Sequence, residues 1–282
     1  MKDMLLTYNE YNRDLGYVQG MSDLLAPIYA IEQDDAVAFW GFVKFMERME
    51  RNFLRDQSGM RLQLLMLDHL CQLLDPKLYD HLAKLDSTNF FFFFRMLLVW
   101  FKREFDFTAI LRLWEGLWTD HLSANFHIFI ALAILEKHRD VIMQHLKGFD
   151  EVLKYVNELS GTIDLPSTMV RAEALFRRFR KTVEAVDKQA NFPDVPVRQR
   201  LPQPPPVTTP GADGRPRRRS SAVATGSGSA SGRDRTVGEH VAAGIGAERE
   251  KVVSPELRAL LSREVQRLDK TEVRAHGGGV AS

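Results

Sequence analysis

The stretch DLGYVQGMSDL, residues 14–24, places one amide side chain between two glycines, close to the start of the sequence. The amide of Gln19 can accept hydrogen bonds through its oxygen and donate two through its nitrogen. Gly16 and Gly20 allow the backbone to turn and to approach another molecule closely. Two interpretations follow. Gln19 marks a turn between two helices, or its amide is held on a loop where it acts on a bound partner.

Other chemistries lack their residue patterns. The eight histidines show neither a His-Glu-x-x-His motif nor paired cysteine and histidine spacing, so no metal site is expected. The sequence has neither a glycine-rich phosphate loop nor a Gly-x-Ser-x-Gly nucleophile elbow. Cys71 lies in a leucine-rich stretch, which favours a small buried thiol over a nucleophile. The sequence therefore does not indicate an enzyme with its own small substrate, and no cofactor of its own is expected.

A second unusual stretch, residues 90–105, reads FFFFFRMLLVWFKREF and is followed by LRLWE at residues 111–115. Aromatic side chains at this density must be buried, so we expect the tryptophans of both stretches to anchor helix packing. A charge in an apolar setting is costly unless it is paired. We therefore predict a structural network of charged and aromatic residues, made of Arg95, Trp100, Arg103, Glu104 and Trp114.

Helical periodicity dominates the elements that must position these stretches. Leucines at spacings of three and four predict an apolar helix face over residues 60–74. Further helices are predicted over residues 123–135, 149–159 and 167–188. Asp35 and Asp75-Pro76 have the residue types of helix starts, with Asp35 as a capping residue. Since no convincing strand pairs or hairpin turns occur, the fold class is all-α.

Charge and composition divide the 282 residues into two parts. Residues 1–188 hold 23 Lys and Arg against 27 Asp and Glu, a net charge of −4, whereas residues 189–282 hold 15 against 10, a net charge of +5. The total of +1 argues against nucleic-acid binding. The longest apolar run, residues 90–101, is too short and too charged to span a bilayer. With one cysteine, the sequence predicts a cytoplasmic protein without direct membrane insertion.

The second part carries most of the proline and a Gly/Ser/Ala stretch. We expect a disordered linker over residues 189–253, because it has too little apolar surface to offset chain entropy. Residues 254–270 begin with Ser-Pro-Glu and predict an isolated amphipathic helix, which is either marginal or a docking helix. Residues 271–282 are expected to be disordered. Ser220 and Ser221 follow three arginines and are candidate phosphorylation sites, or part of a solvated charge cluster.

The two unusual stretches together resemble the TBC domain of Rab GTPase-activating proteins, over about residues 1–180, and within it the branch of family members fifteen and seventeen. The first matches the family's glutamine-finger motif and the second its later aromatic and charged motif. The matching segments are Gly16-Tyr-Val-Gln-Gly-Met21, Phe94-Arg95, Phe101-Lys-Arg-Glu-Phe105, Leu113-Trp-Glu115, Asn125-Phe-His127 and Ile134-Leu-Glu136.

This resemblance implies a multi-helix GTPase-activating domain that supplies an arginine and a glutamine in trans to a GTP-bound Rab protein. The partner carries GTP and Mg²⁺. The arginine stabilises charge that develops on the phosphoryl oxygens, and the amide positions the attacking water. Gln19 matches the glutamine. The resemblance further implies that Tyr17, Gly20, Ser22 and Asp23 bind the GTPase or support the site. It also implies a role in vesicle transport and autophagy, peripheral to endomembranes.

The family's arginine lies in an Ile-x-x-Asp-x-x-Arg motif upstream of the Tyr-x-Gln motif. Of the sixteen residues before Tyr17, Arg13 alone is an arginine, and its surroundings resemble the helix leading into the glutamine loop. We therefore expect residues 1–188 to be a partial domain with reduced activity, because an arginine finger contributes about 10³–10⁵ in rate. The alternative is a non-catalytic module that binds a Rab protein or an adaptor in membrane trafficking.

Overall fold

A computed structural model describes residues 1–190 and 253–265. Every regular element in these ranges is helical, which confirms the predicted fold class. None of their helices is long and apolar enough to cross a membrane. In chain order the elements are α1 (Lys2–Tyr11), α2 (Met21–Glu32), α3 (Asp35–Met49), η1 (Glu50–Phe53), α4 (Ser58–Leu74), α5 (Pro76–Lys84), η2 (Phe91–Phe93), α6 (Phe94–Leu98), α7 (Phe107–Trp118), α8 (Phe126–Lys137), α9 (Arg139–His145), α10 (Phe149–Glu158), α11 (Leu165–Ala190) and α12 (Pro255–Ala259).

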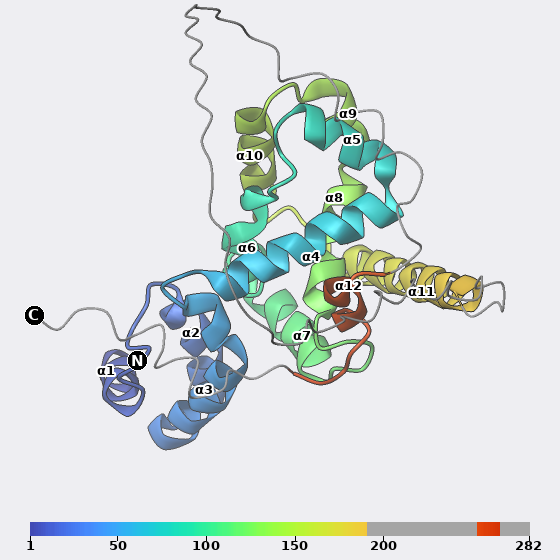
Figure 1. The fold of residues 1–282 in the computed structure, drawn as a ribbon. Helices are drawn as coiled ribbons and strands as arrows, with labels where there is room; N and C mark the ends of the chain where they lie inside the picture. Colours follow the sequence, from blue (N-terminus) through green and yellow to red (C-terminus); the bar gives the residue numbers. More distant parts are fainter. Residues whose placement is uncertain (191–252, 266–282) are drawn as a thin grey trace, which may run out of the picture. The chain divides into compact units, whose positions relative to one another are not determined.

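Helix α4 runs through the middle of the domain (Figure 1). At one end of it lie α1, α2 and α3, and towards the other end lie α5 and α9, whereas α10 packs on η2. Helix α4 contacts α5, α6 and α8 directly, whereas α2 packs on α3. The glutamine stretch lies between α1 and α2, so it belongs to the first of these two ends.

Helices α4 and α8 carry much of the core. The leucine stripe predicted for residues 60–74 is buried along α4, where Leu67 and Leu70 have no exposed surface. Helix α8 is buried on every side from Phe126 to Leu135. A helix that is apolar all round is stable only inside a protein, so α8 lies in the core, where it contacts α4, α6 and α9.

Most of the aromatic side chains in residues 90–105 are buried as predicted, but that of Phe91 is exposed, with 52% of its surface accessible. These residues do not form one continuous helix. The chain passes from η2 into α6 and then turns sharply, because Trp100 and Phe101 both adopt positive φ angles, of 46° and 59°. This left-handed conformation costs a non-glycine residue about 1–2 kcal/mol. The buried indole N–H of Trp114 donates to the carbonyl of Trp100 over 2.9 Å and so supports the turn.

Several predicted boundaries differ from the structure. The capping residue of α3 is Asp34, not Asp35, because the Asp34 carboxylate accepts from the backbone N–H of Val37. Helix α11 continues to Ala190. The helix predicted for residues 254–270 ends at Ala259, and it packs on α4. From residue 191 to residue 252, a range that includes Ser220 and Ser221, the predicted linker over residues 189–253 falls outside the described residues. The terminus over residues 271–282 also lies outside them.

Candidate functional site

Gln19 lies on the loop between α1 and α2, and its side chain is exposed. Among the described residues, none forms a hydrogen bond with its amide. The loop therefore presents both the donor and the acceptor groups of this amide to an approaching molecule. Tyr17, two residues earlier, is also exposed, with 48% of its surface accessible.

The backbone on both sides of Gln19 is held in place. The side-chain oxygen of Asn9, on α1, accepts from the N–H of Tyr17 over 3.1 Å. The N–H of Met21 donates to the carbonyl of Val18 over 3.1 Å, and the N–H of Val18 points at the Met21 sulfur over 3.3 Å. The loop is thus a closed turn between two helices, as in the first interpretation of the motif, and it leaves the amide of Gln19 exposed.

Gly20 is where the loop enters the core. Its φ angle is 108°, which side chains rarely adopt. A Cβ atom there would lie 3.3 Å from a Val99 methyl group and 3.4 Å from the Phe53 ring. Glycine is therefore required both by the backbone conformation and by the close approach of the residues before the Trp100 turn.

Asp23 joins the glutamine loop to the second predicted stretch. Its carboxylate accepts two hydrogen bonds from Arg103, of 2.8 and 3.2 Å. This bond raises the pKa of the Arg103 guanidinium. The carbonyl of Arg103 in turn accepts from the Ser160 hydroxyl over 2.7 Å. Asp23 therefore links the first turn of α2 to the second stretch, and the half-buried Ser22 lies on the same turn.

The predicted ion-pair network is divided between two carboxylates. Arg95 donates to Glu104 over 3.0 Å, whereas Arg103 pairs with Asp23. The Glu104 side chain has no exposed surface, but 38% of each arginine side chain is accessible. Burial raises the pKa of the Glu104 carboxyl, and the nearby Arg95 counteracts this effect. Of the three charged residues in the predicted network, only Glu104 is thus fully buried, as the sequence predicts.

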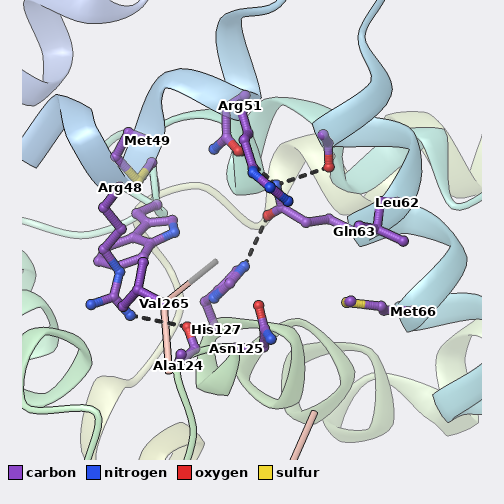
Figure 2. A pocket seen from close by; sticks show the side chains of 13 residues that line it. Arg48, Met49, Arg51, Leu62, Gln63, Met66, Ala124, Asn125, His127 and Val265 are labelled. Carbon is purple, nitrogen blue, oxygen red and sulfur yellow. Dashed lines mark hydrogen bonds between the residues drawn. The ribbon is translucent and has the colours of Figure 1, made fainter. Parts of the chain in front are cut away.

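A buried polar chain lies behind the glutamine loop, and the sequence analysis missed it. Asn52 donates to the carbonyls of Leu97 and Leu98, over 3.3 and 3.2 Å. Its side-chain oxygen accepts from Gln63 over 2.6 Å, and the Gln63 oxygen lies 2.9 Å from Nε2 of His127 (Figure 2). Since each amide can be oriented in one way only, His127 must donate from Nε2, and its Nδ1 is a bare acceptor.

His127 lies beside a cavity of about 70 Å³. Burial, together with the charge of Arg48, lowers the pKa of His127 to about 3, so the ring is neutral. The guanidinium of Arg48 stands 4.8 Å from the centre of the Trp100 ring, and it donates to Asp120 and to the carbonyl of Ala124. The polar chain ends at the carbonyls of Leu97 and Leu98, and the Leu98 side chain comes within 3.7 Å of a Cβ built on Gly20. The polar chain therefore supports the backbone of Leu97 and Leu98, on which the glutamine loop packs.

Two further sequence predictions concern residues remote from this loop. Cys71 is buried, and burial raises the pKa of its thiol to about 12, which removes it as a nucleophile at neutral pH. Arg13 is exposed and pairs with Glu10 one turn earlier on the chain, over 2.6 Å. The structure therefore gives Arg13 a local partner on the surface.

Comparison with known proteins relates these features to one family. Residues 1–143 match the Rab-GTPase-TBC domain. Over 189 residues the chain is 66% identical to GTPase-activating protein GYP7 of Yarrowia lipolytica, which covers 67% of this chain and 26% of that protein. Over 178 residues it is 48% identical to human TBC1 domain family member 17, and this match covers 63% of this chain and 28% of that protein. The chain thus spans about a quarter of the length of these relatives.

A solved structure confirms the fold. The crystal structure of the Ypt/Rab-GAP domain of Gyp1p resembles the chain with a TM-score of 0.54, over 61% of this chain and 62% of that one. The sequence identity in this comparison is 23%, so the likeness concerns the arrangement of helices alone. The roles of individual side chains, Gln19 included, must therefore be argued from the geometry of this chain.

Proposed function

Because the chain belongs to the Rab-GTPase-TBC domain family, we propose that it accelerates GTP hydrolysis by a GTP-bound Rab GTPase, and that Gln19 supplies a catalytic amide in trans. The observation that carries this proposal is the combination of an exposed, unengaged amide with a fixed backbone. A catalytic group must reach the partner, and it must also arrive in a defined geometry.

The amide acts on the attacking water. Its oxygen accepts a hydrogen bond from the water, and its nitrogen donates one to an oxygen of the nucleotide or of the GTPase. This fixes the water in line with the γ-phosphate, which is how a glutamine acts in GTP hydrolysis. The partner brings GTP and Mg²⁺, so the chain needs no cofactor of its own.

The residues around Gln19 have separate tasks in this proposal. Tyr17 is exposed beside the amide and forms part of the surface that the GTPase contacts. Gly20 lets the turn pack on Val99. Asp23 is a positioning residue, since its bonds to Arg103 fix the first turn of α2, on which Ser22 also lies. The chain works in the cytoplasm and reaches endomembranes through its partner.

Single-turnover GTP hydrolysis by a panel of purified Rab GTPases tests the proposal. We expect the chain to accelerate at least one of them, and Gln19→Ala to lower that acceleration on the order of 10²-fold, the usual cost of removing one preorganised donor at a reacting oxygen. GYP7 of Yarrowia lipolytica serves as the positive control for the assay. Leu6→Ala, at an exposed apolar position of α1, serves as the matched control and should retain full activity.

A binding measurement separates the catalytic proposal from the non-catalytic module. Affinity for each GTPase is compared in the GTP-bound and GDP-bound forms, with the wild-type chain and with Gln19→Ala. Binding to the GTP-bound form that survives the substitution, without any acceleration by the wild-type chain, would identify a binding module and overturn the catalytic role of Gln19.

A further inference from the structure

Residues 253–265 form a short segment that lies on the surface of the domain. It carries Leu257 inside the helix, and Val253 and Leu260 just outside its two ends, at spacings of four and three. All three side chains are buried, with 8%, 8% and 0% of their surface accessible. The segment also lies outside residues 1–143, which the family comparison matches.

The surface under this segment is formed by α4 and by the loop between α7 and α8. Helix α12 contacts α4 (Figure 1). At the start of the segment, the Ser254 hydroxyl lies 3.4 Å from Nδ1 of His69, on α4. At its end, Val265 lines the cavity beside His127 (Figure 2). The segment therefore crosses from the middle of α4 to the edge of the buried polar chain.

The loop before α8 supplies hydrogen bonds to the end of α12. The N–H of Ala124 donates to the carbonyl of Ser262 over 2.9 Å, and the Asn125 amide donates to the carbonyl of Ala259 over 3.1 Å. Carbonyls at a helix C-terminus have no partner inside the helix. The domain thus donates to two backbone carbonyls of this segment, one of which, that of Ala259, also accepts from the N–H of Ser262 over 3.2 Å.

A helix of five residues does not persist alone in water, because the cost of starting a helix exceeds the gain from so few bonds. The burial of three apolar side chains and the bonds from the loop before α8 supply what the helix lacks. The order of the segment is therefore a consequence of its contact with the domain, as in a peptide that folds on binding.

We propose that the surface of α4 and the loop before α8 is a binding groove for a short amphipathic peptide, and that residues 253–265 occupy it in cis. The ligand is defined by a capping serine and by three apolar side chains in the pattern of Val253, Leu257 and Leu260. A second peptide with this pattern binds the groove only when the chain's own segment leaves it.

The connection along the chain favours the cis arrangement. Residues 191–252, 62 in number, separate α11 from the segment. An extended chain of that length reaches roughly 200 Å, so length does not prevent the contact. Tethering to the same chain raises the effective concentration of the segment at the groove. Occupancy in cis therefore requires only a weak intrinsic affinity.

The test uses the full chain and a fluorescein-labelled peptide of residues 252–266. We expect the wild-type chain to bind this peptide at least tenfold more weakly than the variant Leu257→Asp/Leu260→Asp, whose own segment no longer fills the groove. The same two substitutions in the peptide should abolish its binding. Arg263→Ala, at an exposed position of the segment, is the matched control and should behave as the wild-type chain.

Hydrogen exchange on the same proteins gives an independent measurement. In the Asp variant, the Ala124 amide should exchange at least tenfold faster, because it loses the carbonyl of Ser262. The milder Leu260→Ala should give an intermediate increase, and it replaces the double variant if that variant unfolds. Equal peptide affinity for all chains, or unchanged exchange at Ala124, would overturn the proposal. A wild-type dimer that the Asp variant converts to a monomer would show docking in trans and would overturn the cis assignment.

Discussion

Arg103 binds both carboxylate oxygens of Asp23, although 80 residues separate them in the sequence. The contact joins the first turn of α2, four residues after Gln19, to the turn that follows Trp100. Both side chains are partly exposed, with 38% and 22% of their surface accessible, so the pair contributes little to stability, at most about 1 kcal/mol. Its effect on the position of the glutamine loop is expected to be larger than its effect on folding.

The first prediction concerns this ion pair. Asp23→Arg should lower GTPase activation on the order of tenfold, because a small displacement of a catalytic group is costly. Arg103→Asp in the same chain should restore most of the loss by re-forming the pair with reversed charges. Single-turnover rates and urea unfolding of each variant are measured together. Lys154→Ala removes an exposed ion pair with Glu158 and should change neither quantity. Additive losses in the double variant would refute the positioning role of Asp23.

The second prediction concerns Gly20. Gly20→Ala should destabilise the domain by about 1–3 kcal/mol, because alanine is strained at a φ of 108° and its methyl group meets Val99 at 3.3 Å. Gly116→Ala is the matched control, and its effect on unfolding free energy should be opposite in sign. It lies within α7 at an exposed position with ordinary contacts, and it should stabilise the domain by about 0.5–1 kcal/mol. Urea unfolding measures both, and a neutral Gly20→Ala would contradict the geometry of the loop.

The third prediction concerns pH. The pKa of His127 is about 3 in the folded chain, below the ordinary value of 6.5, so the unfolded chain binds more protons between these values. Stability should therefore fall as the pH falls from about 6.5 towards 3. His127 accounts for a loss of at most roughly 5 kcal/mol in unfolding free energy. Burial also lowers the pKa of His138, which adds to the loss in the same direction.

Unfolding free energies of His127→Gln over this pH range provide the measurement. The variant should lose stability at neutral pH but should show a shallower decline on acidification than the wild-type chain. His145→Gln, at an exposed position, controls for the loss of one imidazole. Parallel pH curves for the wild-type chain and His127→Gln would show that His127 is not the buried neutral group described above.

The fourth prediction concerns Trp114. Trp114→Phe should cost at least about 1–3 kcal/mol in unfolding free energy, because the buried carbonyl of Trp100 loses its donor. Trp118→Phe replaces a neighbouring tryptophan with 44% of its surface exposed and should cost less than about 1 kcal/mol. Similar losses for the two variants would show that the bond to Trp100 contributes nothing specific.

Periodicity and residue type predicted much of this architecture. The leucine stripe of residues 60–74 and the all-round apolar pattern of residues 123–135 lead directly to α4 and α8, since each depends on neighbours in the sequence. The exposed Gln19 follows from a polar residue between glycines once the family resemblance is added. The assignment of a catalytic role to this residue stays a prediction.

Contacts between distant segments could not be predicted in this way. No spacing links Asp23 to Arg103, or Asn52 to Gln63 and His127, because each pairing depends on how the helices pack. The docked position of α12 was also beyond local reasoning. Its sequence indicates an amphipathic helix, but only the packing against α4 and the loop before α8 shows where that helix lies.

The left-handed pair Trp100 and Phe101 has a consequence for how this domain can change over evolutionary time. Glycine would suit the backbone at either position, but it would empty a large buried site, at a cost of several kcal/mol. Each aromatic ring therefore fills space that glycine could not fill, although its backbone conformation is unfavourable. The hydrogen bond from Trp114 to the carbonyl of Trp100 adds a third residue to this arrangement. A single substitution at any of these three positions should therefore lower stability, and a change at one of them favours compensating changes at the other two.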